Sequence, residues 1–296
     1  MVSVQSICRL LGFTPQAYHK KSKRLFVKQV NDDLIIDQVR HLRKLQPRCG
    51  TRKLLIDLQP FLQQQHIALG RDYFFHLMAA NKLLVHKTKR SVHTTNSKHH
   101  FRRYPNLAKT FEPMKAHELW VSDITYIPLK NRFAYLFLIT DAYSRKIVGH
   151  HVSDDMKVSS AVVALKKAID QKPMETIVIH HSDRGIQYCS HEYVNLLQQH
   201  HALISMTQSG DPLENAIAER VNGILKTELI SSSYEDIDKA ALSIARAVTV
   251  YNYKRRHSSL NYQVPNDVHT QKGPQIKRWK NYNYSRKKKE VSMPET

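Results

Sequence analysis

The chain has 296 residues, of which 41% are hydrophobic, so it is long enough for a sizeable core and for more than one domain. Its longest nearly unbroken apolar stretch, residues 133–139, is far too short to cross a bilayer, and its first residues lack the basic and apolar regions of a secretory signal. Three scattered cysteines without a C-x-x-C pair argue against a disulfide framework and against a cysteine zinc site. We therefore predict a cytoplasmic protein with no membrane partner.

Charge is the most informative part of the composition. The formal net charge is +21, which indicates a polyanionic partner. Residues 1–110 hold 21 Lys and Arg against 5 Asp and Glu, residues 111–230 hold 12 against 14, and residues 231–296 hold 13 against 6. A nearly neutral middle between basic ends predicts a catalytic core flanked by nucleic-acid-binding segments. The alternative is a basic surface that serves solubility, although a net charge of about 2–8 suffices for that in a small domain.

The first residues have the pattern of two short helices around a turn, over residues 4–20. Gly12 lies in the turn, Thr14 is the predicted N-cap of the second helix, and Pro15 takes the favoured first helical position. We therefore predict a helix-turn-helix-like segment over residues 1–30.

A second helical unit is predicted over residues 31–85. Apolar residues recur at helical spacing in three stretches, at residues 34–45, 51–65 and 71–81. Pro60 is expected to kink or end the second stretch. The basic positions Arg48, Arg52 and Lys53 favour a helical DNA-binding domain, and the alternative is a generic three-helix bundle with a solvated basic face.

The middle of the chain changes to an α/β pattern. Strands are predicted at residues 119–128, 133–141, 145–152, 176–180 and 203–206, and helices at residues 158–169, 190–200, 213–230 and 236–253. Three strands in an antiparallel meander, followed by alternating helices and strands, predict an α/β fold with a mixed sheet. The predicted core spans residues 113–270, after a basic linker at residues 86–112 and before a basic tail at residues 271–296.

Three acidic residues of this core have contexts that suit metal ligands. Asp123 interrupts an apolar strand-like run, Asp183 follows another such run, and Glu219 lies in a predicted helix, with 35 residues between the last two. Carboxylates at strand ends and on a helix can converge on a pair of Mg²⁺ ions, because Mg²⁺ prefers oxygen ligands. Two ions about 3.5–4 Å apart activate the attacking oxygen and stabilise the leaving oxygen in phosphodiester chemistry.

Each acid has a competing interpretation. Asp123 could end a strand, but a carboxylate among apolar residues is costly unless it is paired or binds a metal. Asp183 could be an ordinary turn residue before Arg184 and Gly185. For Glu219 the competitors are two other acids of the same stretch, Glu214 and Glu228.

Helical phase favours Glu219 over these competitors. Asn215, Glu219, Asn222 and Lys226 follow one another at spacings of four, three and four residues and therefore share one helix face. A face with one acid, two amides and one cation suits a helix that meets both metal and DNA. The alternative is a solvated helix surface.

Two further groups are candidates for the site. His181, two residues before Asp183, could orient a metal ligand or contact DNA, and the alternative is a structural histidine at a strand end. Arg255, Arg256 and His257 are predicted to bind phosphate, with a solvated loop as the alternative.

The octapeptide H-S-D-R-G-I-Q-Y, His181–Tyr188, resembles the H-S-D-R-G-x-Q-Y motif of insertion-sequence transposases of the OrfB type. Further matches follow the order of that family, at residues 120–127, 205–210, 215–219, 225–226 and 251–265. The resemblance covers roughly residues 4–270, and the separation of Asp183 and Glu219 equals the family's usual spacing.

This resemblance implies an RNase H-like core with a D-D-E triad of Asp123, Asp183 and Glu219 and two Mg²⁺ ions, with Mn²⁺ as an alternative. The implied function is a DNA transposase that nicks transposon ends and joins the 3′-hydroxyl to DNA. The expected DNA contacts are Arg184, Asn215, Asn222, Lys226, Arg255, Arg256 and His257, together with Arg48, Arg52 and Lys53.

The resemblance also implies partners. These are the terminal inverted repeats of a transposon, target DNA, further copies of the chain, and an upstream helix-turn-helix protein with which the chain is made as a frameshift fusion. A bacterial protein that associates with the nucleoid when it binds DNA is then expected. An RNase H-like nuclease without strand transfer and a non-catalytic DNA-binding protein are the two alternatives.

Overall fold

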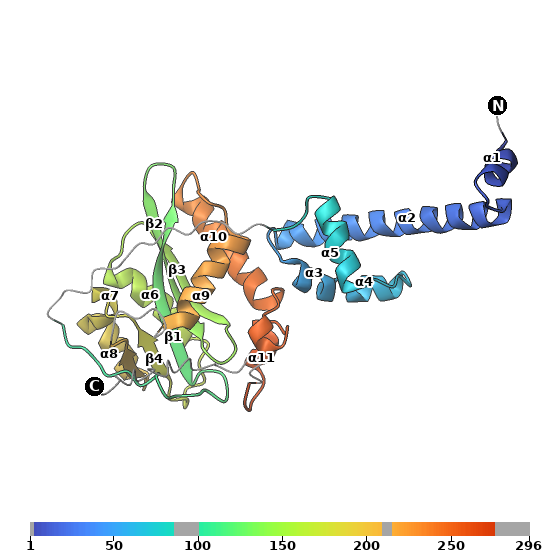
Figure 1. The fold of residues 1–296 in the computed structure, drawn as a ribbon. Helices are drawn as coiled ribbons and strands as arrows, with labels where there is room; N and C mark the ends of the chain where they lie inside the picture. The colour runs from blue at the N-terminus through green and yellow to red at the C-terminus, as the bar shows by residue number, and fades with distance from the viewer. Residues whose placement is uncertain (1–2, 86–100, 209–214, 276–296) are drawn as a thin grey trace, which may run out of the picture.

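A computed structural model describes residues 3–85, 101–208 and 215–275 of the chain (Figure 1). The linker and tail predicted from the sequence lie mostly outside these residues, as does Glu214. A helical N-terminal part precedes an α/β part, as the sequence predicts. No described helix combines the length and the hydrophobicity that a membrane span requires.

The N-terminal part is built on one long helix. After α1 (Val4–Leu10), α2 runs without interruption over Pro15–Leu45 and extends away from the rest of the molecule (Figure 1). Thr14 caps α2 as predicted, because its side chain accepts a hydrogen bond from the backbone N–H of Ala17 at 3.1 Å. The boundary predicted between residues 30 and 31 falls inside α2, since neither Gly nor Pro interrupts residues 16–45.

Three short helices pack on the C-terminal half of α2. These are α3 (Thr51–Asp57), α4 (Gln59–Gln64) and α5 (Arg71–Ala80). Pro60 lies in the first turn of α4, which accounts for the predicted break in this stretch. The helices enclose a small apolar core of Ile35, Ile36, Val39, Leu54, Leu58, Leu62, Phe74 and Met78.

The α/β part contains one five-stranded mixed sheet in the order β3-β2-β1-β4-β5. The strands are β1 (Leu119–Pro128), β2 (Phe133–Asp141), β3 (Ile147–Ser153), β4 (Ile179–Ser182) and β5 (Leu203–Met206). The first three strands form an antiparallel meander, and β4 and β5 join β1 in parallel. This topology confirms the predicted α/β fold and agrees with the expected RNase H-like arrangement.

Helices cover both faces of the sheet (Figure 1). One face packs against α6 (Val158–Ile169), α7 (Ile186–Cys189) and α8 (His191–Gln199), and the other against α9 (Ala216–Ile224) and α10 (Ile237–Tyr253). The alternation of β2 explains this division, because Phe137 and Ile139 enter the first core while Leu136 and Leu138 enter the second. A π-helical turn, η2 (Leu225–Leu229), follows α9, and η3 (Ser258–Leu260) and α11 (Pro265–His269) follow α10.

Close packing of α6 on the sheet depends on one glycine. A Cβ atom at Gly149 of β3 would collide with the backbone carbonyl oxygen of Ala164. The absence of a side chain at this position therefore allows α6 to approach the strand backbone directly.

Several buried histidines are held in the neutral form. The Nε2 atom of His180 lies 2.7 Å from the hydroxyl of Ser122 and 3.0 Å from that of Tyr193, and burial lowers the pKa of His180 to about 3. Burial likewise lowers the pKa of His257 to about 2 and the pKa of His150 to about 4. Folding therefore requires these imidazoles to give up protons that they bind in the unfolded chain below a pH of about 6.5.

Stability should therefore rise with pH between about 5 and 6.5. The unfolded chain binds more protons than the native protein wherever a folded histidine has a lowered pKa, and each such proton contributes about 1.4 kcal/mol per pH unit. Asp123 opposes the trend by one proton, because burial raises its pKa to about 7. Urea unfolding at a series of pH values across this range measures how the free energy of unfolding changes with pH. The exposed His66 gives the control, for which His66→Gln should leave that pH dependence unchanged. A free energy of unfolding that does not change with pH would contradict the prediction.

Candidate active site

Strand pairing places Asp123 beside Asp183. In the parallel pair of β1 and β4, Leu119 lies opposite Ile179 and Val121 lies opposite His181. The same register continued by two residues puts Asp123 opposite Asp183, the residue that directly follows β4. Neighbouring strands are about 4.7–4.9 Å apart and residues in register point to the same face, so the two carboxylates belong to one site.

Local hydrogen bonds orient both carboxylates. The Oδ1 atom of Asp123 accepts from the backbone N–H of Ile124 at 2.9 Å, and Oδ1 of Asp183 accepts from the backbone N–H of Gly185 at 2.9 Å. A Cβ atom at position 185 would lie 3.0 Å from that Asp183 oxygen. Glycine therefore permits the tight turn that holds Asp183 at the end of β4.

Two asparagines fasten α9 to β1. Asn215 donates from Nδ2 to the backbone carbonyl of Ser122 at 2.9 Å, and Asn222 donates from Nδ2 to Oδ2 of Asp123 at 2.7 Å. Both side chains are buried, and within the described residues their Oδ1 atoms have no hydrogen-bond partner. Their amino groups hold the helix that carries Glu219, and the DNA contacts expected of these asparagines remain predictions.

The electrostatics of Asp123 connect the three acids. Its pKa is raised to about 7, chiefly by burial and then by the charges of Asp183 and, more weakly, Glu219, whereas the hydrogen bond from Asn222 lowers it. Burial lowers the pKa of Lys226, and the nearby Asp123 carboxylate opposes that effect. The predicted polar face of α9 therefore does meet the strand that carries Asp123.

The donor chemistry of this site suits a hard cation. It offers carboxylate oxygens and buried amide oxygens, and the mutual repulsion of the acids favours a positive charge between them. Within the described part of the chain, however, no three His, Cys, Asp or Glu side chains are grouped tightly enough to hold a metal ion together. Asp123 and Asp183, with Glu219 nearby on α9, are thus a candidate metal site whose three carboxylates are not yet close enough to bind one ion together.

Two motif residues next to Asp183 bind neighbouring backbone and side chains. Arg184 donates from its guanidinium to the carbonyl oxygens of Thr207 and Gln208, just beyond β5. His181 is fully buried, and its Nδ1 lies 2.8 Å from the hydroxyl of Ser205. His181 thus connects β4 to β5 through Ser205.

Glu228 is separated from the triad and organises an ionic cluster. Its carboxylate accepts two hydrogen bonds from the Arg255 guanidinium, at 2.7 and 2.8 Å, and two from the Lys53 ammonium, at 2.9 and 3.3 Å. Arg255 also donates to the Nε2 of His257 at 3.0 Å, and both residues are buried. Glu228 thus faces cations, Arg255, His257 and Lys53 have partners inside the chain, and the assignment of Glu219 to the triad stays a prediction.

Further contacts connect the helical part to the core beside this cluster. Arg256 forms an ion pair with Asp57 of α3, and Arg48 donates to the carbonyl oxygen of Thr227 in η2. Arg52, by contrast, is exposed. Most cations that the sequence assigned to phosphate therefore lie at the junction between the two parts. Sequence reasoning missed Asp57 and the role of Glu228, because contacts across such long separations leave no local pattern.

Comparisons with known proteins agree with this geometry. Residues 113–212 and residues 200–265 each match a model of the integrase core domain. An uncharacterized 31 kDa protein of insertion element IS600 from Shigella sonnei is 32% identical over 263 residues, covering 86% of this chain and 94% of that protein. The transposase of IS629 from Shigella sonnei is 29% identical and covers 88% of this chain and 90% of that protein.

Solved structures add a distant likeness. The catalytic core domain of HTLV-2 integrase in complex with magnesium aligns with a TM-score of 0.42 at 18% identity, covering 53% of this chain and 99% of that one. The paired acids on a mixed sheet and the matched models define an integrase-type core. The chain belongs to the family of insertion-sequence transposases that carry this core.

Replacing Arg255 with alanine should destabilise the fold by about 3–5 kcal/mol, because it leaves the half-buried carboxylate of Glu228 with one cation fewer. The free energy of unfolding in urea measures the effect. The exposed neighbour Lys254 gives a matched control, for which Lys254→Ala should change stability by at most about 0.5 kcal/mol. An Arg255→Ala protein of normal stability but weaker DNA affinity would show that the phosphate-binding prediction was right.

Replacing Asn222 with alanine should weaken divalent-metal binding by about 10–100-fold, because residues that support a metal ligand typically contribute that much. The substitution removes the hydrogen bond that lowers the pKa of Asp123, so protons compete better for this carboxylate. Calorimetric titration with Mn²⁺ measures the affinity, with Asn195→Ala on α8 as the control. Unchanged metal affinity together with weaker DNA binding would instead support the direct DNA contact predicted from the sequence.

Proposed function

We propose that this insertion-sequence transposase cuts and joins DNA with Asp123, Asp183 and Glu219 as its catalytic residues. The observation that carries the proposal is the parallel register of β1 and β4, which sets Asp123 beside Asp183 while Asn222 ties the helix of Glu219 to Asp123. Membership in a transposase family supplies the substrate class, and the basic composition of the chain agrees with it.

The proposed reaction consists of two phosphodiester exchanges. In the first, water attacks a phosphorus atom at a transposon end, the bond from phosphorus to the 3′-oxygen breaks, and a 3′-hydroxyl and a 5′-phosphate result. In the second, that 3′-hydroxyl attacks a phosphorus atom of target DNA and displaces a different 3′-oxygen. No covalent protein intermediate is needed, because each attack is an in-line displacement.

The carboxylates would hold two Mg²⁺ ions, or Mn²⁺ in their place, which supply charge stabilisation to the attacking and the leaving oxygen. The residues of the chain would provide the geometry for this. Asp123 of β1 and Asp183 directly after β4 belong to neighbouring inner strands of the sheet, and Asn215 and Asn222 fix the position of α9 against β1. Lys226, near Asp123, would add positive charge where a DNA phosphate approaches.

The proposed partners follow from the reaction. The chain would bind the terminal inverted repeats and the target DNA, and at least two copies would assemble to bring two ends together. An upstream helix-turn-helix protein, joined to this chain as a fusion, would contribute further DNA-binding and dimerising segments. The protein would then act on DNA of the bacterial nucleoid.

Asp183→Asn should lower both cleavage and strand joining by at least about a thousandfold, because it weakens interactions worth several kcal/mol at about 1.4 kcal/mol per factor of ten. The assay uses labelled DNA from the ends of the element that encodes the chain, with Mg²⁺, and tests the chain and its upstream fusion. The exposed Asp238→Asn is the control and should leave both reactions intact.

The products separate the alternatives. Cleavage without joining would favour a nuclease that only hydrolyses DNA. Binding of the labelled ends without any reaction, by the chain and by the fusion alike, would contradict the catalytic proposal and favour a DNA-binding protein.

A further inference from the structure

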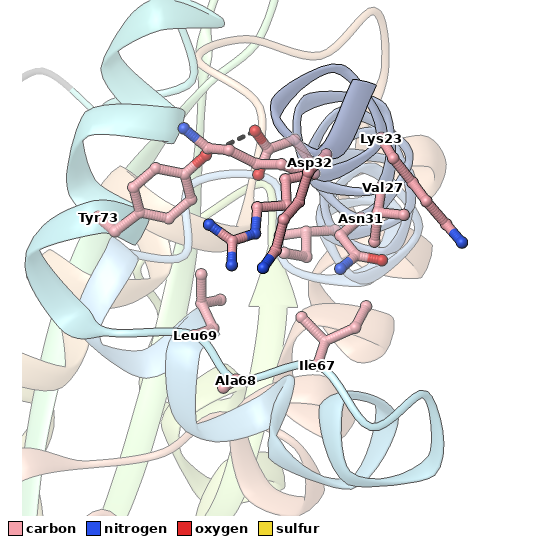
Figure 2. A pocket seen from close by; sticks show the side chains of 12 residues that line it. Lys23, Val27, Asn31, Asp32, Ile67, Ala68, Leu69 and Tyr73 are labelled. Carbon is pink, nitrogen blue, oxygen red and sulfur yellow. Dashed lines mark hydrogen bonds between the residues drawn. The ribbon is translucent and has the colours of Figure 1, made fainter. Parts of the chain in front are cut away.

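A groove lies between the N-terminal half of α2 and the segment that leads into α5 (Figure 2). Its volume is about 450 Å³. Val27 of α2 lines it on one side and Ile67 and Leu69 line it on the other, as Figure 2 shows, and Tyr73 faces Asp32 across one end. The cations that border it are Lys20, Lys23, Arg24 and Lys28.

The cations of the groove occupy one face of α2. Lys20, Arg24 and Lys28 follow one another at spacings of four residues, and Lys23 lies three residues after Lys20, as neighbours on a helix face do. Two turns further along, the same face carries Ile35, which is buried in the core of the helical part. The face that packs against protein in one half of α2 thus continues as a cationic surface in the other half.

The positive charge of this surface has no acidic counterpart in the same half of α2. Asp32 is the first acidic residue of the helix, and its Oδ2 accepts a hydrogen bond from the Tyr73 hydroxyl at 2.6 Å. The ammonium of Lys28 lies 4.7 Å from the centre of the Tyr73 ring, which places it at the groove. Like charges four residues apart, as at Lys20, Arg24 and Lys28, destabilise a helix by a few tenths of a kcal/mol per pair. Asp32, four residues after Lys28, offsets positive charge at only one end of this surface, so a bound polyanion would relieve the repulsion among the other cations.

We propose that this groove binds the sugar-phosphate backbone of duplex DNA. The proposal rests on the proposed function and assigns part of its DNA-binding surface to residues 20–28 of α2. These cations differ from the core arginines discussed above, because Arg255 and Arg256 pair with acids of the chain whereas these are exposed.

The density of charge favours DNA over an acidic protein segment. From Lys20 to Lys28 the helix rises about 12 Å. Duplex DNA carries one negative charge per about 1.7 Å of its axis, so about seven phosphates lie along that length and can engage all four cations. Contacts to phosphate carry no sequence information, so binding through this groove should be independent of sequence.

The test is the salt dependence of binding to fluorescent 30-base-pair duplexes of random sequence. Each phosphate contact contributes about 0.9 to the slope of the logarithm of affinity against the logarithm of salt concentration. The quadruple variant K20Q/K23Q/R24Q/K28Q should therefore lower this slope by three to four and weaken binding equally for all duplexes. Glutamine preserves helix propensity, and circular dichroism checks that the variant keeps the helical content of the wild type.

A matched variant separates position from net charge. K130Q/R132Q/K166Q/R246Q removes four exposed cations of the α/β part and should change the slope by less than one. An equal loss of slope in both variants, or an unchanged slope in the groove variant, would overturn the proposal. A groove variant that binds DNA normally but changes the sedimentation coefficient of the DNA-free protein would also overturn it, in favour of a protein partner.

Failure of this proposal can be distinguished from failure of the proposed function. If the groove proposal alone is wrong, the groove variant binds DNA like the wild type and the wild type still cuts and joins transposon ends. If the catalytic proposal alone is wrong, no cutting occurs, but the groove variant still shows the loss of slope.

Discussion

The cost of placing like charges side by side is the constraint on which this molecule depends. Parallel pairing of β1 with β4 puts Asp123 next to Asp183, and burial together with this neighbour raises the pKa of Asp123 to about 7. Such an arrangement persists only if the surrounding structure holds it in place. The hydrogen bonds from Asn222, Ile124 and Gly185 stabilise the charged forms of the two carboxylates. A cation would remove the repulsion that remains between them.

Helix α9 and the π turn that follows it make contacts with two different parts of the chain. Helix α9 is tied to β1 by Asn215 at its N-cap and by Asn222 near its C-terminal end, which holds the helix of Glu219 against the strand of Asp123. Beyond Leu225 the chain passes into a π turn, whose extra residue per turn changes the helical phase. Glu228 consequently contacts Arg255 and Lys53 rather than the acid pair. The π turn η2 therefore connects the position of the N-terminal helical part to the position of α9.

Local pattern predicted most of the fold, and long-range pairing explains what it missed. Alternating apolar residues gave the strands of the meander within two residues of their observed bounds, and β5 was predicted at its observed bounds. The fourth strand begins at Ile179 rather than Thr176, because pairing with β1 begins there and Ile177 remains exposed. The roles of the triad residues remain predictions, while the partner of Arg255, 27 residues away, left no signal in the sequence.

The cations of this chain fall into two groups, those that pair with acids of the folded chain and those that are exposed on α2. The sequence predicts that Arg255, Arg256 and Lys53 contact DNA, because they lie in basic segments of the chain. Each of them has an acidic partner in the folded chain. A cation already paired in a low-dielectric junction gives up that interaction if it turns to DNA, so its net contribution to binding is small. Lys20, Lys23, Arg24 and Lys28 of α2 are exposed and have no acid before Asp32 in that helix, so binding DNA breaks no buried ion pair there. Affinity for a polyanion should therefore concentrate on the arm formed by α2, which extends from the catalytic part and can reach DNA beyond the site of reaction (Figure 1).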